Sequence, residues 1–372
     1  MDVALVVPYP TEVAANRLRI EQYLPYLEAQ GWRARVYRFM SPAFYRIVYQ
    51  PGRYGEKMLG FLAASARRLS QLPRLRQADV VVVHREAFPY GPPFLEEALA
   101  HRGASLVFDF DDAIYLPNYS PANRAVAWLK RPSKVGRIIA HSVQVIAGNA
   151  HLARYARRWA SRVTIIPTPV DTTRFHPPAM PPERETVTIG WIGSHTTVDT
   201  LRLVEPALRQ LAARYPQVRF LVVGGPYAGT LPRLENRPWS LAREVEDLHE
   251  LDIGLMPLVD DEWSRGKCGF KILLYMSGGI PTVCSPVGVN PEIVEDGATG
   301  FLARDPAEWY QRLAYLVEHP EARRALGAAA WRTLESRYSV AVQAPRFAAV
   351  LAAAARARLR PPGCWPPDAA RA

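Results

Sequence analysis

The sequence predicts an α/β fold built from two doubly wound domains, each a parallel sheet with helices on both faces. Short runs of β-branched residues alternate with helical patterns through most of the 372 residues, which is typical of such a sheet. Apolar runs such as Val80 to Val83 suit strands that are buried on both faces. The alternation stops in a proline-rich stretch and then restarts, which predicts two such domains in series.

The first domain is expected to span residues 1–175. We expect it to bind one ligand and the second domain to bind a different one. Its strands are predicted over residues 3–7, 35–38, 79–84, 105–110, 143–147 and 163–166. Helical patterns lie between them, over residues 14–30, 54–72, 93–101, 134–140 and 150–160. Parallel sheets of this kind bind ligands at the carboxyl ends of their strands, so polar residues that directly follow a strand are the first candidates.

A proline-rich linker over residues 176–186 separates this domain from a second one, expected over residues 187–340. The predicted strands of the second domain are 187–192, 218–223, 253–256, 282–285 and 300–302. Its predicted helices cover 201–215 and 270–276, and further ones begin at Pro306 and Pro320. A long alanine-rich helix over 340–358 leads into a C-terminal tail, and we treat residues 341–372 as a separate helix and tail.

The charge of the chain is unevenly distributed. There are 46 Lys and Arg against 35 Asp and Glu, a formal net charge of +11. Residues 1–180 hold 24 of these basic residues and 13 of the acidic ones, so the later residues, with 22 of each, are neutral. Two interpretations remain open: the first domain meets an anionic partner, or it has a basic, solvated surface.

The cysteines and the apolar segments limit the class of protein. Cys268, Cys284 and Cys364 show no metal-binding spacing and no neighbouring histidine cluster, which argues against a zinc site or a disulfide framework and favours a reducing cytoplasm. The first residues read as a β-strand and not as a signal peptide. No window approaches the roughly 18 apolar residues of a membrane span. We therefore expect a cytoplasmic protein, at most attached peripherally to a membrane.

Residues 266–281, Gly-Lys-Cys-Gly-Phe-Lys-Ile-Leu-Leu-Tyr-Met-Ser-Gly-Gly-Ile-Pro, are the most informative segment. The chain has only five lysines, and Lys267 and Lys271 stand four residues apart at a predicted helix start. Free backbone N–H groups and the helix dipole favour an anion there, and a diphosphate would fit. The alternative is a surface helix with two solvated lysines.

This segment and its continuation to residue 302 resemble the nucleotide-sugar half of the glycosyltransferase family 4 proteins. Three further stretches support the resemblance: Ile-Ile-Pro-Thr-Pro-Val-Asp-Thr-Thr-Arg-Phe (165–175), Ile-Gly-Trp-Ile-Gly-Ser (189–194) and Asp-Ile-Gly-Leu-Met-Pro-Leu (252–258). Together they cover about residues 140 to 305. The resemblance implies the GT-B fold, in which two Rossmann-like domains face a central cleft. It also implies transfer from a nucleoside diphosphate sugar with retention of configuration and without a required metal or cofactor.

The resemblance assigns roles to residues of the second domain. Gly193 and Ser194, on the turn after its first strand, would approach the diphosphate through backbone N–H groups, and Phe270 belongs to the same donor site. Lys267 and Lys271 would neutralise the charge that builds on the leaving phosphate. Asn290 and Glu292 are candidate contacts to the donor sugar or nucleotide, although Pro-Glu-Ile-Val is equally compatible with a plain helix start.

Two departures from the family pattern concern ribose and phosphate binding. The family usually carries two glutamates eight positions apart around this helix, one near the sugar and one binding the ribose diol. Gly266 and Leu274 stand at these positions. Ribose binding is therefore left to other groups, among them Asp260, Asp261 and Glu262, or the donor differs, or activity is lost. The usual Arg and Lys pair after the first strand of the second domain is also missing.

The first domain offers a second set of polar residues. Asp109, Asp111 and Asp112 come at the end of its fourth strand, where many family members have a histidine. They are candidates for orienting an acceptor hydroxyl, for capping a turn or, less expected, for holding a divalent cation. Further acceptor-binding candidates are Arg17 and Arg19, which would grip a phosphate or face solvent, and Asn149, which directly follows a strand.

A basic, aromatic-rich stretch spans residues 45–76. A segment of this composition lies on an anionic membrane in some proteins, and it is equally compatible with a helix packed on its sheet. The membrane interpretation agrees with the resemblance, because many such transferases act on lipid-linked acceptors.

The sequence as a whole predicts a retaining glycosyltransferase of cell-surface polysaccharide synthesis. Its partners would be a nucleotide sugar, a glycan or lipid-linked acceptor and an anionic membrane surface met by the basic first domain. The alternative is a non-catalytic protein of the same fold that lost turnover together with the glutamate pair. Nucleic acid is not an expected partner, because the excess charge comes with no nucleic-acid-binding motif.

Overall fold

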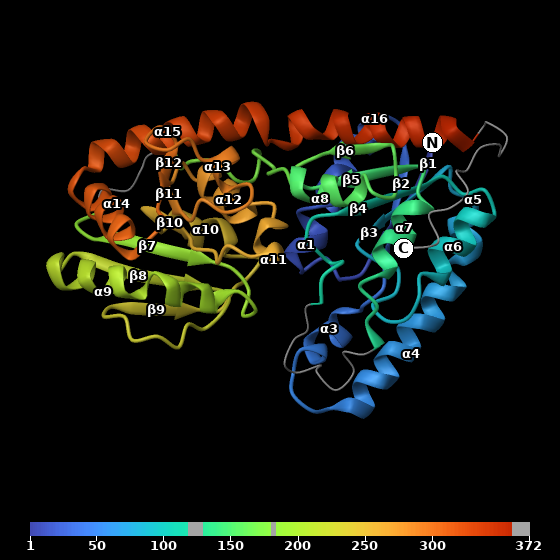
Figure 1. Cartoon of the computed structure of the whole chain (residues 1–372), viewed down its shortest axis with the longest axis horizontal. Coiled ribbons are helices and arrows are strands. Elements are labelled where there is room, and N and C mark those ends of the chain that lie inside the picture. The colour runs from blue at the N-terminus through green and yellow to red at the C-terminus, as the bar shows by residue number, and fades with distance from the viewer. Residues whose placement is uncertain (118–128, 180–183, 359–372) are drawn as a thin grey trace. The chain divides into compact units, whose positions relative to one another are not determined.

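The computed structural model describes residues 1–117, 129–179 and 184–358, and the chain divides into two compact units (Figure 1). The first unit contains Met1–Thr168 together with the C-terminal residues from Gln343 onward. The second unit contains Pro169–Val342. The prolines at 181 and 182 and the tail after residue 358 lie outside the described residues.

The sheet of the first unit has six parallel strands in the order β2-β1-β3-β4-β5-β6. The three central strands are buried almost throughout, because helices cover both faces of the sheet and apolar side chains point in both directions. The strands are β1 (Asp2–Val7), β2 (Arg33–Arg38), β3 (Val80–His84), β4 (Leu106–Phe110), β5 (Gln144–Ala147) and β6 (Val163–Ile165).

The helices of the first unit connect these strands. They are α1 (Ala14–Arg17), the 3-10 turn η1 (Glu21–Tyr23), α2 (Leu24–Ala29), α3 (Pro42–Val48), α4 (Tyr54–Ser70), α5 (Leu72–Gln77), α6 (Phe94–His101), α7 (Lys134–Ala140) and α8 (Ala150–Ala156). The C-terminal helix α16 (Val340–Arg358) joins this unit from Gln343 onward. The ring of its Phe347 stacks on Tyr23 with a centroid distance of 4.3 Å.

The second unit repeats this plan with the strand order β12-β11-β10-β7-β8-β9, again all parallel. Its strands are β7 (Val187–Ile192), β8 (Val218–Val223), β9 (Leu234–Arg237), β10 (Ile253–Met256), β11 (Thr282–Cys284) and β12 (Gly300–Leu302). Its helices are η3 (Val198–Leu203), α9 (Glu205–Arg214), α10 (Glu244–His249), α11 (Glu262–Arg265), α12 (Phe270–Ser277), α13 (Asn290–Ile293), α14 (Pro306–Glu318) and α15 (Pro320–Arg337).

Both sheets contain a switch point, where the chain changes the direction in which it adds strands. In the first unit this point lies between β1 and β3, and in the second it lies between β7 and β10. Ligands of doubly wound sheets bind just outside the carboxyl ends of the strands at such points. The two doubly wound sheets confirm the predicted fold class and locate one candidate site in each unit.

Two predicted helices are wrong as single elements. The pattern over residues 14–30 folds as α1, η1 and α2, and the pattern over 201–215 folds as η3 followed by α9. Each of these regular helices starts anew with a proline in its first turn, Pro25 in α2 and Pro206 in α9. Proline has no N–H for the preceding turn, so it suits a helix start and not a helix interior. The short elements α3, α5, β9, α10 and α11 were not predicted, and α13 lies where a plain helix start was one of the two open interpretations.

Candidate functional site

In the second unit, the turns that follow β7 and β8 pack backbone against backbone. Gly224 has φ +103°, and a Cβ there would stand 2.0 Å from the carbonyl oxygen of Gly193. A Cβ on Gly225 would stand 2.8 Å from the Cα of His195. Glycine is required because only a residue without a side chain allows this approach. Gly224 and Gly225 thus allow the turn after β8 to pack directly on the backbone of the turn after β7.

Tyr275 of α12 fixes the helix to the switch point. Its hydroxyl accepts a hydrogen bond from the Ile192 amide at the end of β7 (3.0 Å) and donates one to the Leu255 carbonyl of β10 (3.2 Å). Gly254 makes room for the ring, since a Cβ there would stand 2.4 Å from it. Burial raises the pKa of Tyr275 well above its ordinary value, with the Ile192 hydrogen bond acting in the opposite direction. The hydroxyl therefore keeps its proton and serves both strands.

Lys271 lies one helical turn before Tyr275 and reaches the same place. A Cβ on Gly193 would stand 2.6 Å from Lys271 Cε, so the lysine side chain runs directly over the glycine. Its ammonium lies 5.0 Å from the centre of the Trp191 ring, within the range of a cation–π interaction. Gly193 and Lys271, two of the predicted donor-site residues, thus lie next to each other at the switch point of the sheet.

Lys267 and the start of α12 lie beside this group. Gly269 precedes the helix with φ +66°, and a Cβ there would stand 2.4 Å from Ile293 of α13, so only glycine allows the two elements to meet. Lys267 is half-buried in the loop before it, with its ammonium 5.7 Å from the Trp263 ring centre. Two ammonium groups and the positive end of an eight-residue helix therefore lie in one loop region, which is chemistry suited to an anion.

The other predicted donor residues are placed as follows. Ser194 is exposed on the turn after β7, where its hydroxyl pairs with that of Thr196 at 2.7 Å. Phe270 is the first residue of α12 and is partly buried. Asn290 is buried, and its amide donates to the Ser285 carbonyl at 2.9 Å, so in this structure it ties the end of β11 to α13. Glu292 is exposed on α13.

The carboxylates that were considered for ribose binding act within their own loop. Asp261 caps α11 by accepting from the Ser264 amide at 2.7 Å, and Asp260 accepts from Arg265 at 2.8 Å. Leu274, at one of the two glutamate positions of the family, is buried in the helix. The helix face at that position is therefore packed with a hydrocarbon side chain.

In the first unit, a buried charged network lies at the carboxyl ends of β3 and β4. Arg19 donates to both carboxylate oxygens of Asp109 and to the Ile166 carbonyl at 2.7 Å. His84 Nδ1 lies 2.7 Å from Asp109 and donates to it. Burial alone raises the pKa of Asp109, but the charge of Arg19 and the His84 hydrogen bond outweigh it and hold the pKa below its usual value. Asp109 and Arg19, both predicted acceptor residues, are thus partners of each other.

Arg85 forms the outer part of this network. Directly after β3 it adopts a left-handed backbone conformation with φ 62°, and its guanidinium donates to Asp111 and to Asp112, each at 2.7 Å. Burial alone would raise the pKa of Asp111, but Arg85 and His84 outweigh it and lower the pKa well below its ordinary value. The Asp111 and Asp112 side chains remain partly exposed, at 13% and 23%. They are the carboxylates of this cluster that a ligand can reach.

Tyrosines surround this outer part of the network. Tyr9, after β1, lies edge-on to Tyr45, which lies edge-on to Tyr49. The neighbouring Tyr49 and burial raise the pKa of Tyr9 well above its ordinary value, against the opposing charge of Arg85. Burial also raises the pKa of Tyr45 and of Tyr49, so all three tyrosines remain neutral at ordinary pH, and all three are partly exposed. Aromatic rings beside carboxylates and a guanidinium form a surface suited to a polyhydroxylated ligand.

Arg17 and Asn149 have positions that the pattern alone did not indicate. Arg17 is buried in α1, so the solvent-facing interpretation is wrong for it and for Arg19. Asn149 caps α8 by accepting from the Leu152 amide at 2.8 Å, which is a common role of asparagine at the start of a helix. Arg85 and Tyr275 were missed. The signal for Arg85 was its place directly after the strand of four valines and His84, since a position at the end of a strand also pointed to Asp109.

Within residues 1–117, 129–179 and 184–358, no group of three or more His, Cys, Asp and Glu side chains is arranged to hold a metal ion. Over the same ranges, none of the helices has the length and apolar character needed to cross a bilayer. Cys268 and Cys284 are buried, and Cys364 lies outside the described residues.

Comparison with known proteins gives a family match in the second unit. Residues 186–319 match the family model described as glycosyl transferases group 1. A curated relative, the trehalose synthase of Pyrococcus horikoshii, is 30% identical over 87 residues, which are 23% of this chain and 21% of that protein. The chain thus matches about a fifth of the length of this relative.

Solved structures match over nearly the whole chain. Sucrose-phosphate synthase from Thermosynechococcus elongatus superposes with a TM-score of 0.68 at 15% identity, over 96% of this chain and all of the other. Anabaena HepE in complex with UDP and glucose gives 0.67 at 16% identity, over 95% of this chain and all of the other. A glycosyltransferase from Rickettsia africae gives 0.68 at 13% identity, over 95% and 98%.

These findings, with the two parallel sheets, define the class: the protein has the GT-B fold of two-domain glycosyltransferases. The stretch of its second unit that matches the glycosyl transferases group 1 model, residues 186–319, contains Gly193, Lys267 and Lys271. The finer assignment to family 4 and the meaning of the missing glutamate pair stay predictions.

Proposed function

We propose that this chain is a retaining glycosyltransferase that moves a sugar from a nucleoside diphosphate donor to a hydroxyl of a glycan or lipid-linked acceptor. The observation that carries the proposal is the position of Lys271 over Gly193 at the switch point of the second sheet. A bound diphosphate would there meet the backbone of a glycine turn, a helix start and the two ammonium groups of Lys267 and Lys271. Structural neighbours determined with UDP and UDP-glucose support a nucleotide sugar as the donor.

In the proposed reaction, the bond between the anomeric carbon and the diphosphate oxygen breaks and a bond to the acceptor oxygen forms on the same face. The acceptor hydroxyl gives its proton to the departing diphosphate, so no separate base is required. The negative charge on the leaving group grows as the bond breaks, and Lys271 and Lys267 stabilise it more strongly in the transition state than in the ground state. No cofactor takes part in these steps.

We propose that the first unit binds the acceptor through its outer network. Asp111 and Asp112 are partly exposed, and the lowered pKa of Asp111 keeps its carboxylate ionised, so this pair is able to accept hydrogen bonds from acceptor hydroxyls. Arg19 and Asp109 are buried against each other and act as positioning residues, because they hold the ends of the strands from which this network extends. Asn149 acts through the start of α8 in the same way.

We further propose that the protein works in the cytoplasm at an anionic membrane surface, in the synthesis of cell-surface polysaccharide. The support is electrostatic. The first unit contains 28 Lys and Arg against 13 Asp and Glu, a net charge of +15, whereas the second contains 18 against 22. A positive unit of this size is attracted to anionic lipid.

The decisive test combines UDP binding with transfer from UDP-glucose as the first donor. We expect Lys271→Ala to lower kcat/KM by about 100-fold or more, the usual effect of removing one group that stabilises transition-state charge. Lys130→Ala, which removes an exposed lysine of the first unit, serves as the control. Full transfer activity in the Lys271→Ala variant would contradict the assignment.

A second candidate function is nucleotide-sugar binding without turnover. It is favoured by Leu274, a buried hydrocarbon at a position where the family usually has a ribose-binding glutamate. Calorimetric binding of UDP by a wild-type protein that transfers no sugar to any acceptor in a panel of glycans would support it over transfer.

A further inference from the structure

Helix α4 exposes large apolar side chains, whereas an ordinary surface helix buries them against the core. Five large apolar side chains, Tyr54, Met58, Leu59, Leu62 and Leu69, are between 50 and 64% exposed. Tyr54, Met58 and Leu62 are spaced by four residues, and Leu69 follows two turns later, so they form one stripe along the helix. Leu59 lies beside this stripe. We call these five residues the α4 stripe.

The three cations of α4 are held by hydrogen bonds to carbonyl groups of the first unit. Arg68 is buried and donates to the carbonyls of Tyr37 and Val7, at 2.8 and 3.0 Å. Lys57 donates to the Gln50 carbonyl at 2.6 Å, and Arg67 donates to the Phe39 carbonyl. Each of these cations thus bonds a carbonyl of its own unit while the apolar side chains face outward.

The acidic residue of α4 is paired, and the inner face of the helix packs on the first unit. Glu56 pairs with Arg53, directly before the helix. On the inner face, Phe61 packs against Phe39 and Tyr90, with ring centres 5.8 and 5.5 Å apart. The helix therefore packs on the first unit through its inner face, and the α4 stripe takes no part in that packing.

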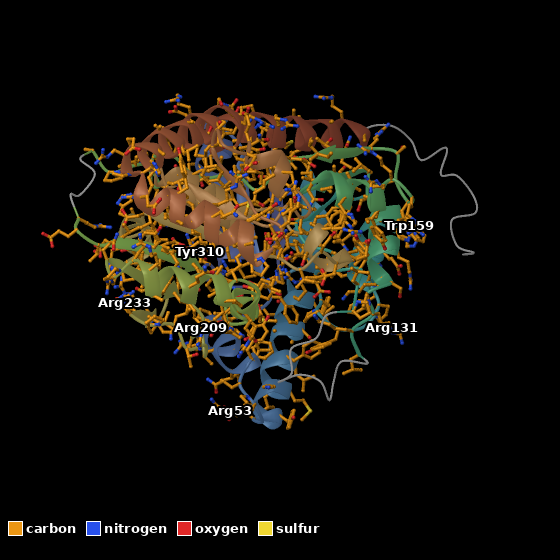
Figure 2. All side chains as sticks on the ribbon, turned by 60° about the vertical axis from the view of Figure 1, so that its left-hand side comes forward. Arg53, Arg131, Trp159, Arg209, Arg233 and Tyr310 are labelled. Carbon is orange, nitrogen blue, oxygen red and sulfur yellow. The ribbon has the colours of Figure 1, made fainter. Side chains whose placement is uncertain are left out.

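The surroundings of the α4 stripe are positively charged. The helices α3 and α5, which both contact α4, carry the exposed Arg46 and Arg74. Arg53 lies at the outer end of α4, where α3 and α4 stand out from the strands of the first unit (Figures 1 and 2). The unit as a whole has a net charge of +15. An apolar stripe flanked by arginines on a strongly positive unit is the chemistry of a surface that inserts between anionic lipid headgroups.

We propose that the α4 stripe is the docking surface for an anionic lipid bilayer, with the apolar side chains entering the acyl boundary and the flanking arginines meeting the headgroups. A second copy of the chain fits less well, because a two-fold contact would bring the same arginines and two positive units together. This inference rests on the proposed meeting of the first unit with an anionic surface and adds the element and the mode of contact.

The test is sedimentation with vesicles of phosphatidylcholine alone or with about one third phosphatidylglycerol. The variant is Met58→Gln/Leu62→Gln, since glutamine matches these residues in helix propensity and adds no charge. We expect its apparent affinity for the anionic vesicles to fall by about tenfold or more. The matched control is Leu203→Gln/Leu241→Gln, which changes two exposed leucines of the second unit and should leave binding unchanged.

The outcomes separate the two proposals. Loss of binding in the stripe variant alone, with an unchanged melting temperature, supports the α4 stripe. Equal binding by the stripe variant and the wild type overturns it and leaves electrostatic attraction intact, which Arg46→Gln/Arg74→Gln would then reduce. A wild type that ignores anionic vesicles overturns both proposals. A lipid-free dimer that the stripe variant disperses also overturns the bilayer as the occupant.

Discussion

At the scale of single residues, the buried network of the first unit is held by matched charges. Asp109 has Arg19 and His84 as partners, and Asp111 has Arg85. Removing a carboxylate from water is costly unless an opposite charge and hydrogen bonds replace the lost hydration. The lowered pKa values of Asp109 and Asp111 show that the cations more than offset burial.

This arrangement predicts acid sensitivity. In the folded protein the pKa of Asp111 lies below its value of about 4 in an unfolded chain, so the unfolded chain takes up the proton first as pH falls. The stability from this group is therefore complete above about pH 5 and is lost as pH falls through 4 and below. We expect Asp111→Asn to melt at a lower temperature than wild type at pH 7, with a smaller further decrease toward about pH 3.

The control for this prediction is Asp199→Asn, whose carboxylate is 78% exposed on the second unit. It should follow the wild-type melting temperature at every pH. An Asp111→Asn variant that parallels wild type down to the lowest pH would contradict a stabilising role for the ionised carboxylate.

Tyr275 supports a second prediction at this scale. Tyr275→Phe leaves the buried Ile192 amide without its acceptor, which costs about 1 to 3 kcal/mol of unfolding free energy. Because the same hydroxyl fixes α12 at the switch point, affinity for UDP should fall as well. Thermal melting and UDP calorimetry check both effects, and Tyr315→Phe, which changes a tyrosine exposed on α14, is the control. Unchanged melting would show that the hydroxyl does not hold the strands together.

At the scale of elements, two glycines in the turns after β7 and β8 allow the turns to meet and leave the space in which Lys271 lies. The close approach of the two turns depends on Gly224, and the path of the lysine side chain depends on Gly193. These two glycines perform different tasks, one in backbone packing and the other in access to the anion site. Replacing each glycine by alanine should therefore affect different properties of the protein.

We expect Gly224→Ala to destabilise the second unit by at least about 2 kcal/mol, because the Cβ overlaps a backbone oxygen and φ is positive. Gly193→Ala displaces Lys271 and the Trp191 ring, so its larger effect should be on UDP affinity. Melting curves and calorimetry measure the two effects. Gly55→Ala, where nothing lies within 4 Å of the added Cβ, is the control. If both substitutions changed only stability, the access role of Gly193 would be excluded.

At the scale of the whole molecule, the C-terminal residues from Gln343 onward belong to the first unit. After β12 the chain forms α14 and α15, and α16 then supplies Phe347 to the core of the unit that β1 began. Arg346 also donates to the Ile165 carbonyl at the end of β6, at 2.9 Å. The first unit is therefore complete only when the last helix has been made.

We expect Phe347→Ala to destabilise the first unit by about 3 to 5 kcal/mol, the usual cost of removing a buried phenylalanine ring. UDP should still raise the melting temperature of the second unit, because a ligand stabilises the state that binds it. Val342→Ala, at a more exposed position of the same helix, is the control. Loss of UDP-dependent stabilisation together with the first unit would show that the two units do not melt independently.

The sequence by itself determined the layered architecture. Buried parallel strands are continuous apolar runs, so β3, β7, β8, β10 and β12 were predicted within a residue of their bounds. The lysine pair and the glycine turn were also evident, because scarce lysines at a helix start are a local feature. Pro25 and Pro206 were equally visible, yet their effect on the helices around them depends on where the chain has to turn to pack.

Only the tertiary structure decided which polar residues pair with each other. Arg19 and Asp109 are 90 residues apart in sequence and 2.7 Å apart in space, so no local pattern marks them as partners. Likewise Tyr275 joins β7 to β10 through contacts that depend on the strand order. The outward face of α4 has the same origin: periodicity defines a stripe, but packing decides whether the stripe is buried. Local chemistry follows from the sequence, whereas the partner of each group is chosen by the fold.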